Sequence, residues 1–600
     1  MLALPALLVV AFSLRVYGIT WDHGYLFHPD ERQIVFVTAR LGAPWPPDWH
    51  LLLSPDSPLN PGFFSYGSLP MYLLRALASV AAQVDPAMAS PRVFYVIGRL
   101  LSALADTGTL WITWALGKKL FGLRAAWLAA SLLALAVLHI QLAHYYAVDT
   151  LLTLGVMLVL WLLVRLVEKP SLGRLVGVAL VTGLASAVKL SALALLAPVC
   201  MAWIVSCWLP RPEKGNALPP DHRLAVAIRG LVIAGWVTAL TFVALQPYTL
   251  IDWPTFWRDA LTESMMVRGR IDMPYTRQFA YTRPYLYQLQ QLVKWSLGPA
   301  LGAVGVLGAI WQLVRIARPW KAGNLQALAE SIGMAWLLIY FGIVGSFYAK
   351  FLRYMLPVTP LLCLWGGAML ARASLHKSSW VRVLARAGTV VTLLSTALYA
   401  VAFVQIYGSP HPWEQSTEWI CNTLPPDSVL MIEHWDQPLP MLQGAGAHDC
   451  WEQFEIVTFP AYDPDTAEKR DALVAALQRT EYIVLASNRL YGSILPLSER
   501  YPLTSTYYRR LFAEELGFEL VHVDQVYPHL GPVRLVNDTL GEVNLPRPAL
   551  LQQEGYRPHD LLWQDADESY SVYDHPMPLV FRRTRSLDAQ TLTRLLTEAP

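Results

Sequence analysis

The sequence His28-Pro29-Asp30-Glu31-Arg32 follows shortly after the first apolar segment of the chain, residues 2–19. Two adjacent carboxylates and an arginine therefore stand where the chain leaves a hydrophobic stretch. Ionisable groups at a membrane edge are costly to place, so they mark a candidate functional site. Because the apolar segment has no basic start and no small-residue cleavage site, we expect a retained span and not a cleaved signal.

The composition indicates a membrane protein. Of the 600 residues, 54% are hydrophobic and only 15% are charged, against about 25% charged residues in a typical soluble domain. The mean hydropathy is +0.36. A net charge of +2 gives no basic surface for a polyanion, which excludes nucleic acid as a partner.

Eleven apolar segments approach the roughly 20 residues that a membrane-spanning helix needs. We therefore predict a polytopic α-helical membrane protein with about 11 transmembrane helices. The segment 68–84 is expected to lie in the membrane interface. The predicted spans are 2–19, 94–116, 125–144, 149–167, 174–188, 190–209, 229–246, 289–314, 327–346, 353–371 and 387–407.

The distribution of Lys and Arg between these spans predicts the orientation. Every second loop is basic, and together these loops hold seventeen Lys and Arg against four Asp and Glu. Since basic loops stay in the cytoplasm, the amino terminus is expected there. This predicts a multi-pass protein of the plasma membrane. The opposite, outer face then gathers Asp30, Glu31, Asp149, Lys189, the loop 247–288, Tyr348, Lys350 and Arg353.

Residues 408–600 contain no predicted span and form a second domain, after a membrane domain at 1–407. Short apolar strands at 429–432, 454–457, 482–485 and 518–521 alternate with helical stretches at about 465–479 and 504–516, which predicts an α/β domain. An odd number of spans places it outside the cytoplasm. Cys421 and Cys450 are the only cysteines outside predicted spans, and a disulfide between them is left open. The stretch 568–575 is expected to form a strand and a turn.

Each acidic candidate has a catalytic and a structural interpretation. Asp30 or Glu31 could act as a general base, and a strand-like loop would point the two side chains in opposite directions. The same residues also suit the first turn of a helix. Asp149 could orient an acceptor or hold a divalent ion, or it could cap the following helix.

The cationic candidates could hold a phosphate. Lys189 and Arg353, with Tyr348 and Lys350 nearby in the sequence, suit a lipid phosphate at the membrane surface. Alternatively, a single Lys or Arg at a helix end reaches the lipid headgroups by snorkelling. Arg15, within the first span, could pair with an acid. No spacing of His, Cys, Asp or Glu resembles a dedicated metal site, so no metal site is predicted, while a divalent cation requirement stays open.

Several short motifs, in this order around the spans, resemble the C-type membrane glycosyltransferases. The resemblance is to the branch that contains the dolichyl-phosphate-mannose protein mannosyltransferases and the bacterial aminoarabinose transferase of lipid A, and it covers about residues 1–407. The motifs are Asp30-Glu31, Arg99-Leu100-Leu101-Ser102-Ala103 with Leu120-Phe121-Gly122, Tyr145-x-x-x-Asp149, Lys189-Leu190-Ser191 and Arg353-Tyr354-x-x-Pro357-x-x-Pro360.

The resemblance implies a sugar transferase with inversion at the anomeric carbon. The donor would be a sugar on a polyprenyl phosphate, Asp30 would be the base, and Lys189 and Arg353 would hold the donor phosphate. The acceptor could be protein, lipid or glycan, because 408–600 differs from the β-trefoil insert of the eukaryotic mannosyltransferases. The alternatives are a transporter or flippase of lipid-linked sugars, and a membrane anchor that displays the outer domain.

Overall fold

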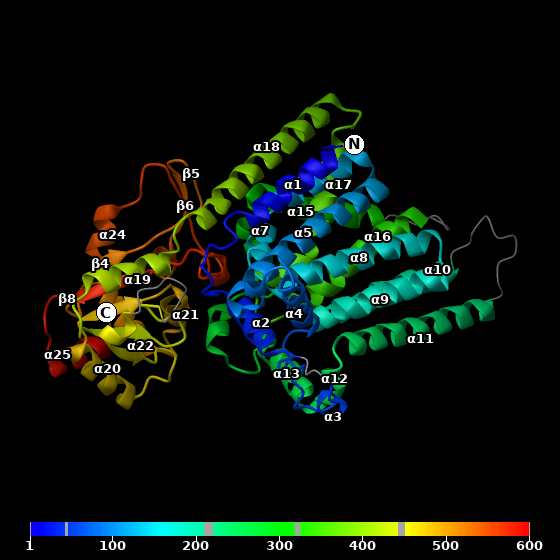
Figure 1. Ribbon diagram of the computed structural model, residues 1–600. Coiled ribbons are helices and arrows are strands. Elements are labelled where there is room, and N and C mark those ends of the chain that lie inside the picture. The colour runs from blue at the N-terminus through cyan, green and yellow to red at the C-terminus, as the bar shows by residue number, and fades with distance from the viewer. Residues whose placement is uncertain (1, 43–45, 209–219, 318–324, 442–449, 599–600) are drawn as a thin grey trace. The chain divides into compact units, whose positions relative to one another are not determined.

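The computed structural model describes residues 2–42, 46–208, 220–317, 325–441 and 450–598 (Figure 1). The chain falls into two compact units. The first, here the membrane unit, comprises residues 1–19, 28–268 and 284–400, and the second comprises 20–27, 269–283 and 401–600. The sequence suggested a single boundary at residue 407. The two loop segments that belong to the second unit, 20–27 and 269–283, have no distinguishing composition.

Within the described ranges, eight helical stretches are long and apolar enough to cross a membrane, and a pair of helices bent by 55° would make a ninth. The bent pair consists of α6 (Leu123–Ala134) and α7 (Val137–Ala143). The eight stretches are α5 (Pro91–Phe121), α8 (Val148–Glu168), η2 with α10 (Leu190–Trp208), His222–Leu245 within α11 (Pro220–Leu245), α15 (Pro299–Ile316), α16 (Leu325–Val344), η5 with α17 (Leu352–Ala373) and Ser379–Thr423, which contains α18 (Ser379–Val404), η6 (Gln405–Gly408) and α19 (Pro412–Thr423).

The prediction of a polytopic helical membrane protein is confirmed, and among the described residues eight of the about eleven predicted spans pass by length and composition, or nine with the bent pair. The two remaining predicted spans are the shorter apolar helices α1 (Ala3–Val16) and α9 (Leu172–Val188). The segment expected in the interface is a third short apolar helix, α4 (Leu69–Ala81). Four of the basic loop residues, Arg211, Lys214, Arg318 and Lys321, lie outside the described residues.

Short helices connect the spans of the membrane unit. Most of them carry an N-terminal Pro or a polar capping residue, which favours helix initiation. They are α2 (Pro29–Arg40), α3 (Trp49–Leu52), η1 (Pro86–Ala89), α12 (Tyr248–Ile251), α13 (Trp253–Val267), α14 (Leu286–Gln291) and the π-helix η4 (Leu292–Ser296).

Small residues let the spans of this unit pack closely. In Figure 1, α8, α9 and α11 run side by side, and these neighbours are in contact. Elsewhere α15 meets α17 at Gly308 and Gly366, where a Cβ atom on Gly308 would lie 2.3 Å from the Gly366 nitrogen. On the other side of α17, a Cβ atom on Gly367 would lie 2.7 Å from the Ala129 nitrogen of α6. In lipid, such close backbone approach provides the packing that holds helices together.

The described part of the second unit contains two β-sheets. The larger sheet has the strand order β2-β1-β3-β8-β4, with β1 parallel to β2 and β3, and β8 antiparallel to β3 and β4. The smaller sheet has the order β5-β6-β7, with β6 antiparallel to β5 and parallel to β7. The strands are β1 (Val429–Glu433), β2 (Glu455–Phe459), β3 (Tyr482–Leu485), β4 (Phe518–Val523), β5 (His529–Leu530), β6 (Val533–Asn537), β7 (Asp560–Trp563) and β8 (Leu579–Arg583).

Helices surround these strands and complete an apolar core. The predicted α/β class is confirmed, because all four predicted strands and both predicted helices are present within a few residues as β1 to β4, α20 and α22. The helices are α20 (Ala467–Arg479), α21 (Arg489–Ile494), α22 (Pro502–Phe512), α23 (Thr539–Glu542), α24 (Ala549–Glu554) and α25 (Ala589–Thr597), with short 3₁₀ turns η3 (Pro274–Phe279), η7 (Trp451–Gln453), η8 (Leu495–Leu497) and η9 (Glu568–Tyr570).

Two further expectations for this unit have definite outcomes. Cys421 and Cys450 form a disulfide with a Cα–Cα distance of 5.6 Å. The expected strand at 568–575 is wrong: this stretch is the 3₁₀ turn η9 followed by turns, and its aromatic residues Tyr570 and Tyr573 are buried. Tyr570 and Val572 alternate with serines in this stretch, and such alternation resembles a strand in the sequence.

Replacing Gly308 with alanine tests the close contact between α15 and α17. We expect the Gly308→Ala variant to lose about 1–3 kcal/mol of stability, because the new Cβ meets the backbone of Gly366, which has no side chain that could move aside. The measurement is thermal unfolding of purified protein in lipid nanodiscs. Gly177→Ala, at a helical position of α9 with open space around the Cβ, serves as the matched control. Equal stability of the two variants would contradict the close packing.

Candidate functional site

The acidic pair lies in the first turn of helix α2. His28 precedes the helix, Pro29 occupies its first turn, and Asp30 and Glu31 follow. This confirms the helix-start interpretation and shows that the strand-like loop is wrong. A proline with its fixed φ favours the first turn, and carboxylates there interact favourably with the positive end of the helix dipole. Both carboxylates are buried, with 8% exposure for Asp30 and none for Glu31.

Glu31 forms a fully buried ion pair with Arg99 of helix α5. The Arg99 Nε donates to Oε1 at 2.8 Å and Nη2 donates to Oε2 at 2.6 Å. The backbone N–H of Tyr146 also donates to Oε1, at 2.9 Å. A bidentate guanidinium and a backbone donor compensate for the desolvation of the carboxylate. Glu31 therefore joins three segments that are distant in sequence: the start of α2, helix α5 and the turn before α8.

Asp30 faces a different cation, Arg353. Its Oδ2 lies 3.2 Å from the Arg353 Nε, and both side chains are about one-tenth exposed. Burial alone would raise the pKa of Asp30. The charges of Arg353, His28 and Lys189 and a hydrogen bond from Tyr66 outweigh burial, so the pKa is lowered from its ordinary value. Asp30 is therefore a carboxylate at neutral pH.

A second ion pair lies beside the first. The Lys189 Nζ donates to Oδ1 of Asp149 at 3.0 Å, and Asp149 is almost fully buried. Ala147 is the N-cap of α8, so the capping interpretation of Asp149 is wrong. Lys189 stands at the break between α9 and η2, and its ammonium lies 5.0 Å from the ring centre of Tyr354. The influence of Lys189 on Asp30 joins the two pairs into one cluster.

Two residues of this cluster, Tyr66 and Glu263, were not predicted from the sequence. Tyr66 is hydrogen bonded to Asp30, and burial raises the pKa of Tyr66 well above its ordinary value. Glu263 lies on α13, within the predicted outer loop. Burial, opposed by Lys189 and Arg353 and reinforced by Asp30, raises the pKa of Glu263. The sequence signal was weak, because Glu263 is one of two acids on this helix, with Asp259 one turn before it.

Tyr348 and Lys350 are placed next to each other. The Lys350 Nζ donates to the Tyr348 carbonyl oxygen at 2.9 Å and lies over the Tyr348 ring. Burial lowers the pKa of Lys350 to about 8, so its positive charge is weaker than that of an exposed lysine near neutral pH. Their role in phosphate binding stays a prediction. Arg353, in contrast, lies within the cluster.

Arg15, on the short apolar helix α1, also pairs with an acid. Arg15 donates to Asp106 at 2.5 Å, and Asp106 contacts His139 at 2.5 Å. His139 in turn is hydrogen bonded to Thr359 of α17. The expectation that Arg15 pairs with an acid is therefore confirmed. Because all four side chains are fully buried, this network joins α1, α5, α7 and α17 without exposing charge to lipid.

Two carboxylate oxygens of the cluster have no hydrogen-bond partner in the described part of the chain: Oδ2 of Asp30 and Oδ2 of Asp149. Buried polar atoms are nearly always hydrogen bonded, so unpaired acceptors mark a place where another molecule can donate. Among the described residues there is no group of three or more His, Cys, Asp or Glu suited to a metal ion. Carboxylates that alternate with Arg353 and Lys189 do not form a set of metal ligands.

Part of the membrane unit matches a known protein family. Residues 95–213, which include Arg99, Asp149 and Lys189, match the family described as dolichyl-phosphate-mannose-protein mannosyltransferase. The predicted resemblance is confirmed. This match supports a membrane glycosyltransferase as the general class of function. No curated protein matches the chain.

Solved structures similar to this chain have low sequence identity. An oligosaccharyltransferase from Archaeoglobus fulgidus, tethered to an acceptor peptide, has 12% identity and a TM-score of 0.47, over 87% of this chain and 73% of that one. ArnT from Cupriavidus metallidurans, bound to undecaprenyl phosphate, has 15% identity and a TM-score of 0.46, over 82% of this chain and 93% of that one.

Removing the guanidinium of Arg99 tests whether the Glu31 pair is structural. We expect Arg99→Leu to destabilise the protein by about 3–5 kcal/mol, because Glu31 is left as a buried charge without its counter-ion. Thermal unfolding in nanodiscs measures the loss.

The matched control for this prediction is Arg92→Leu, at an exposed position on the same helix, which should unfold close to wild type. A double variant, Arg99→Leu with Glu31→Leu, should recover part of the stability, since both buried charges are then gone. Wild-type stability of Arg99→Leu would show that the pair has no structural role.

Proposed function

We propose that this chain transfers a sugar from a polyprenyl-phosphate donor to an acceptor on the outer face of the membrane, with inversion at the anomeric carbon. The observation that carries the proposal is the buried Oδ2 of Asp30, which has no hydrogen-bond partner in the described residues although it lies next to Arg353. A general base needs a free acceptor atom, and a phosphate needs a nearby cation. The family match of residues 95–213 supports the same assignment.

Arg353 and Lys189 are proposed to bind the donor phosphate. Each is partly exposed, with 12% and 14% of its side chain accessible, so each can reach a ligand while one side remains paired. Arg353 can form a bidentate contact with phosphate oxygens, and Lys189 can add a point charge. When the bond from the sugar to the phosphate breaks, the phosphate gains negative charge. Two cations beside it stabilise that charge more in the transition state than in the bound donor.

In the proposed step, Asp30 accepts the proton of the acceptor as the acceptor attacks the anomeric carbon. One bond forms between the acceptor and the sugar, the bond from the sugar to the phosphate breaks, and its electron pair leaves with the phosphate. Attack from the face opposite the phosphate inverts the configuration. Without donor, Arg353 lowers the pKa of Asp30. A phosphate that attracts Arg353 would weaken this effect and make Asp30 a stronger base when the donor is present.

Glu31 and Asp149 are proposed to position other groups. Both oxygens of Glu31 accept hydrogen bonds from Arg99, so Glu31 holds the first turn of α2 and with it Asp30. Asp149 holds Lys189. Its second oxygen has no partner in the described part of the chain and is available to the acceptor or to a sugar hydroxyl.

The proposed orientation has the amino terminus in the cytoplasm and the second unit outside. The Lys and Arg bias of the loops supports it. The disulfide between Cys421 and Cys450 supports it as well, since structural disulfides form in oxidising compartments. The donor class, the acceptor side and the plasma membrane location belong to this proposal.

Replacing Asp30 with asparagine tests the base. We expect Asp30→Asn to reduce sugar transfer by at least about 100-fold, because the amide cannot accept the acceptor proton. The measurement uses purified protein in nanodiscs with a panel of radiolabelled polyprenyl-phosphate sugars. Asp56→Asn, on an exposed loop of the same unit, is the control and should retain activity. Donor binding, measured separately, should persist in both variants.

Full transfer by Asp30→Asn would move the base to another acid, with Asp149 and Glu263 as the next candidates. Complete absence of transfer by folded wild-type protein, with every donor tested, would contradict the transferase proposal. Uptake of labelled donor across the bilayer would then favour the transporter.

The pH dependence of transfer tests the coupling between Arg353 and Asp30. Because the pKa of Asp30 is lowered, Asp30 stays deprotonated, and can act as a base, at pH values below 3.8, the ordinary pKa of an aspartate. In Arg353→Leu one of the charges that lower the pKa of Asp30 is absent, so the pKa rises and we expect the acid limb of kcat/KM to move to higher pH. The measurement is a pH profile of kcat/KM for both proteins. An acid limb that does not move would contradict Asp30 as the titrating base.

A further inference from the structure

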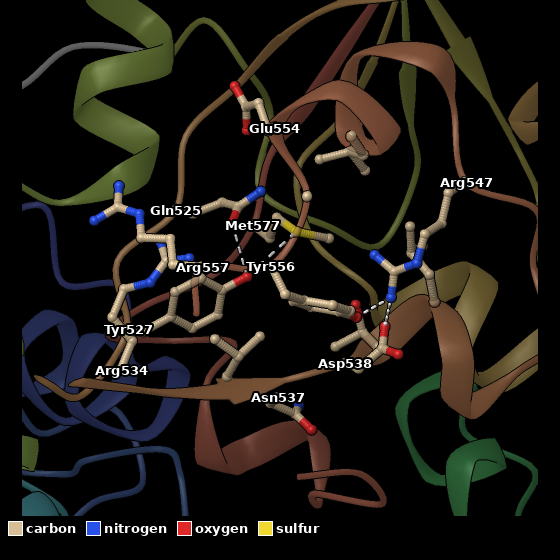
Figure 2. A pocket seen from close by; sticks show the side chains of 15 residues that line it. Gln525, Tyr527, Arg534, Asn537, Asp538, Arg547, Glu554, Tyr556, Arg557 and Met577 are labelled. Carbon is tan, nitrogen blue, oxygen red and sulfur yellow. Dashed lines mark hydrogen bonds and ion pairs between the residues drawn. The ribbon is translucent and has the colours of Figure 1, made fainter. Parts of the chain in front are cut away.

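A pocket of about 320 Å³ lies in the second unit, beside the smaller sheet (Figure 2). The catalytic proposal does not use it. Its walls come from the segment before β5, from β6 and from the region of α23 and α24. This volume is at the lower end of the range for small-molecule sites, about 300–1,000 Å³. Figure 2 shows Tyr527 and Tyr556 near its centre, with Arg547 and Asp538 on one side.

We propose that this pocket binds a neutral saccharide. A sugar ring presents an apolar face of C–H groups and a rim of hydroxyls. The pocket offers matching groups: tyrosine rings for the faces, and planar side chains for hydrogen bonds to the hydroxyls. The planar side chains include Arg547, Asp538 and Gln525.

The two tyrosines are held in place by arginines. The Arg534 guanidinium lies 5.4 Å from the ring centre of Tyr527, and the Arg547 guanidinium lies 4.6 Å from that of Tyr556. Stacking on a guanidinium fixes one face of each ring. The Tyr527 hydroxyl donates to Oε1 of Gln525 at 2.9 Å. Aromatic groups that are already ordered lose little entropy when a ligand binds, so the pocket is preorganised.

Each of these arginines is neutralised by a carboxylate. Arg534 forms a bidentate pair with Asp560, with distances of 2.8 and 2.7 Å, and the two residues are direct partners in the register of β6 and β7. Arg547 donates to Asp538 at 2.6 Å. A free anion would have to compete with both carboxylates. This charge balance favours a neutral ligand over a phosphate or a sulfated glycan.

The pocket is also open to its ligand. Tyr556 is 40% exposed, and Glu554 and Arg557 on the rim are exposed as well. Burial raises the pKa of Tyr556 to about 12, so its hydroxyl, which is hydrogen bonded to Arg547 and Asp538, stays neutral over the physiological range. An apolar wall of Leu540, Leu551 and Met577 lies behind the polar groups. A partly exposed aromatic ring between polar rim groups suits a ligand that enters from solvent.

The test measures saccharide binding by the full-length protein in lipid nanodiscs. Maltoside detergents must be avoided because their headgroups are themselves disaccharides. The probes are mannobiose, chitobiose, cellotriose and maltotriose, with a sulfated heparin disaccharide as the anionic comparison, and calorimetry gives the affinity. We expect at least one neutral probe to bind, and Tyr556→Ala to weaken it by about tenfold or more through loss of the aromatic face.

Two further variants distinguish a loss of the binding site from a loss of folding. Tyr281→Ala removes a tyrosine that is 78% exposed in the same unit and should bind as wild type does. Arg557→Ala changes an exposed rim residue without touching the two paired arginines, and should weaken binding several-fold.

Three outcomes would overturn the saccharide site: no neutral probe binds, neither pocket variant weakens binding, or only the sulfated disaccharide binds. The assay contains no donor and measures no transfer. Its failure would therefore leave the proposed transferase function intact, and a failure of transfer would leave the saccharide site intact.

Discussion

The buried ion pair between Glu31 and Arg99 is the interaction on which the candidate site depends. A carboxylate without exposure to water is stable only if its hydrogen-bonding capacity is used, and Glu31 meets this condition with Arg99 and the Tyr146 backbone. The pair fixes the first turn of α2 against α5 and against the turn that leads into α8. Asp30 is the preceding residue in that turn, so its position follows from the geometry of its neighbour.

The rest of the cluster shows how a membrane protein can hold several charges at low energetic cost. Asp30 faces Arg353, and Asp149 faces Lys189, so each of these two carboxylates has a cation beside it. Each pair is less completely bonded than Glu31 with Arg99, since one oxygen of each aspartate has no hydrogen-bond partner in the described ranges. A fully satisfied pair suits a structural role. An incompletely satisfied pair can exchange its partner for a ligand with little loss, which suits the proposed binding of a charged donor.

The sequence predicted the residue types of the site better than their arrangement. Asp30 stood out because it belongs to an acidic pair just after an apolar segment, and Asp149, Lys189 and Arg353 stood out because each is a charge at the end of an apolar segment. The partner of Glu31 could not be identified in the same way, since Arg99 lies 68 residues away and only the packing of α2 against α5 brings the two together. The sequence signal for Glu263 and Tyr66 was weak, because an acid or a tyrosine in a polar loop is ordinary.

The fold could be predicted where a local sequence pattern determines the secondary structure. The apolar runs indicated the spans, and alternation of strands and helices indicated the α/β class. The count of spans was less certain, because α1 and α9 are shorter than a full crossing and α6 and α7 are bent against each other. The strands β5 to β8 were missed: β5 has only two residues, and β8 pairs with β3 and β4, which lie far from it in the sequence.

The position of β8 has a consequence for the biosynthesis of this protein. It is the last strand in the sequence, yet it lies inside the larger sheet, between β3 and β4. Until the ribosome has released residues 579–583, β3 and β4 each present an edge of unpaired backbone groups. The second unit therefore cannot complete its sheet during most of its own synthesis. A chain truncated by a few dozen residues would lack β8. The unpaired edges of β3 and β4 would then be exposed and would make it a target for chaperones and proteases.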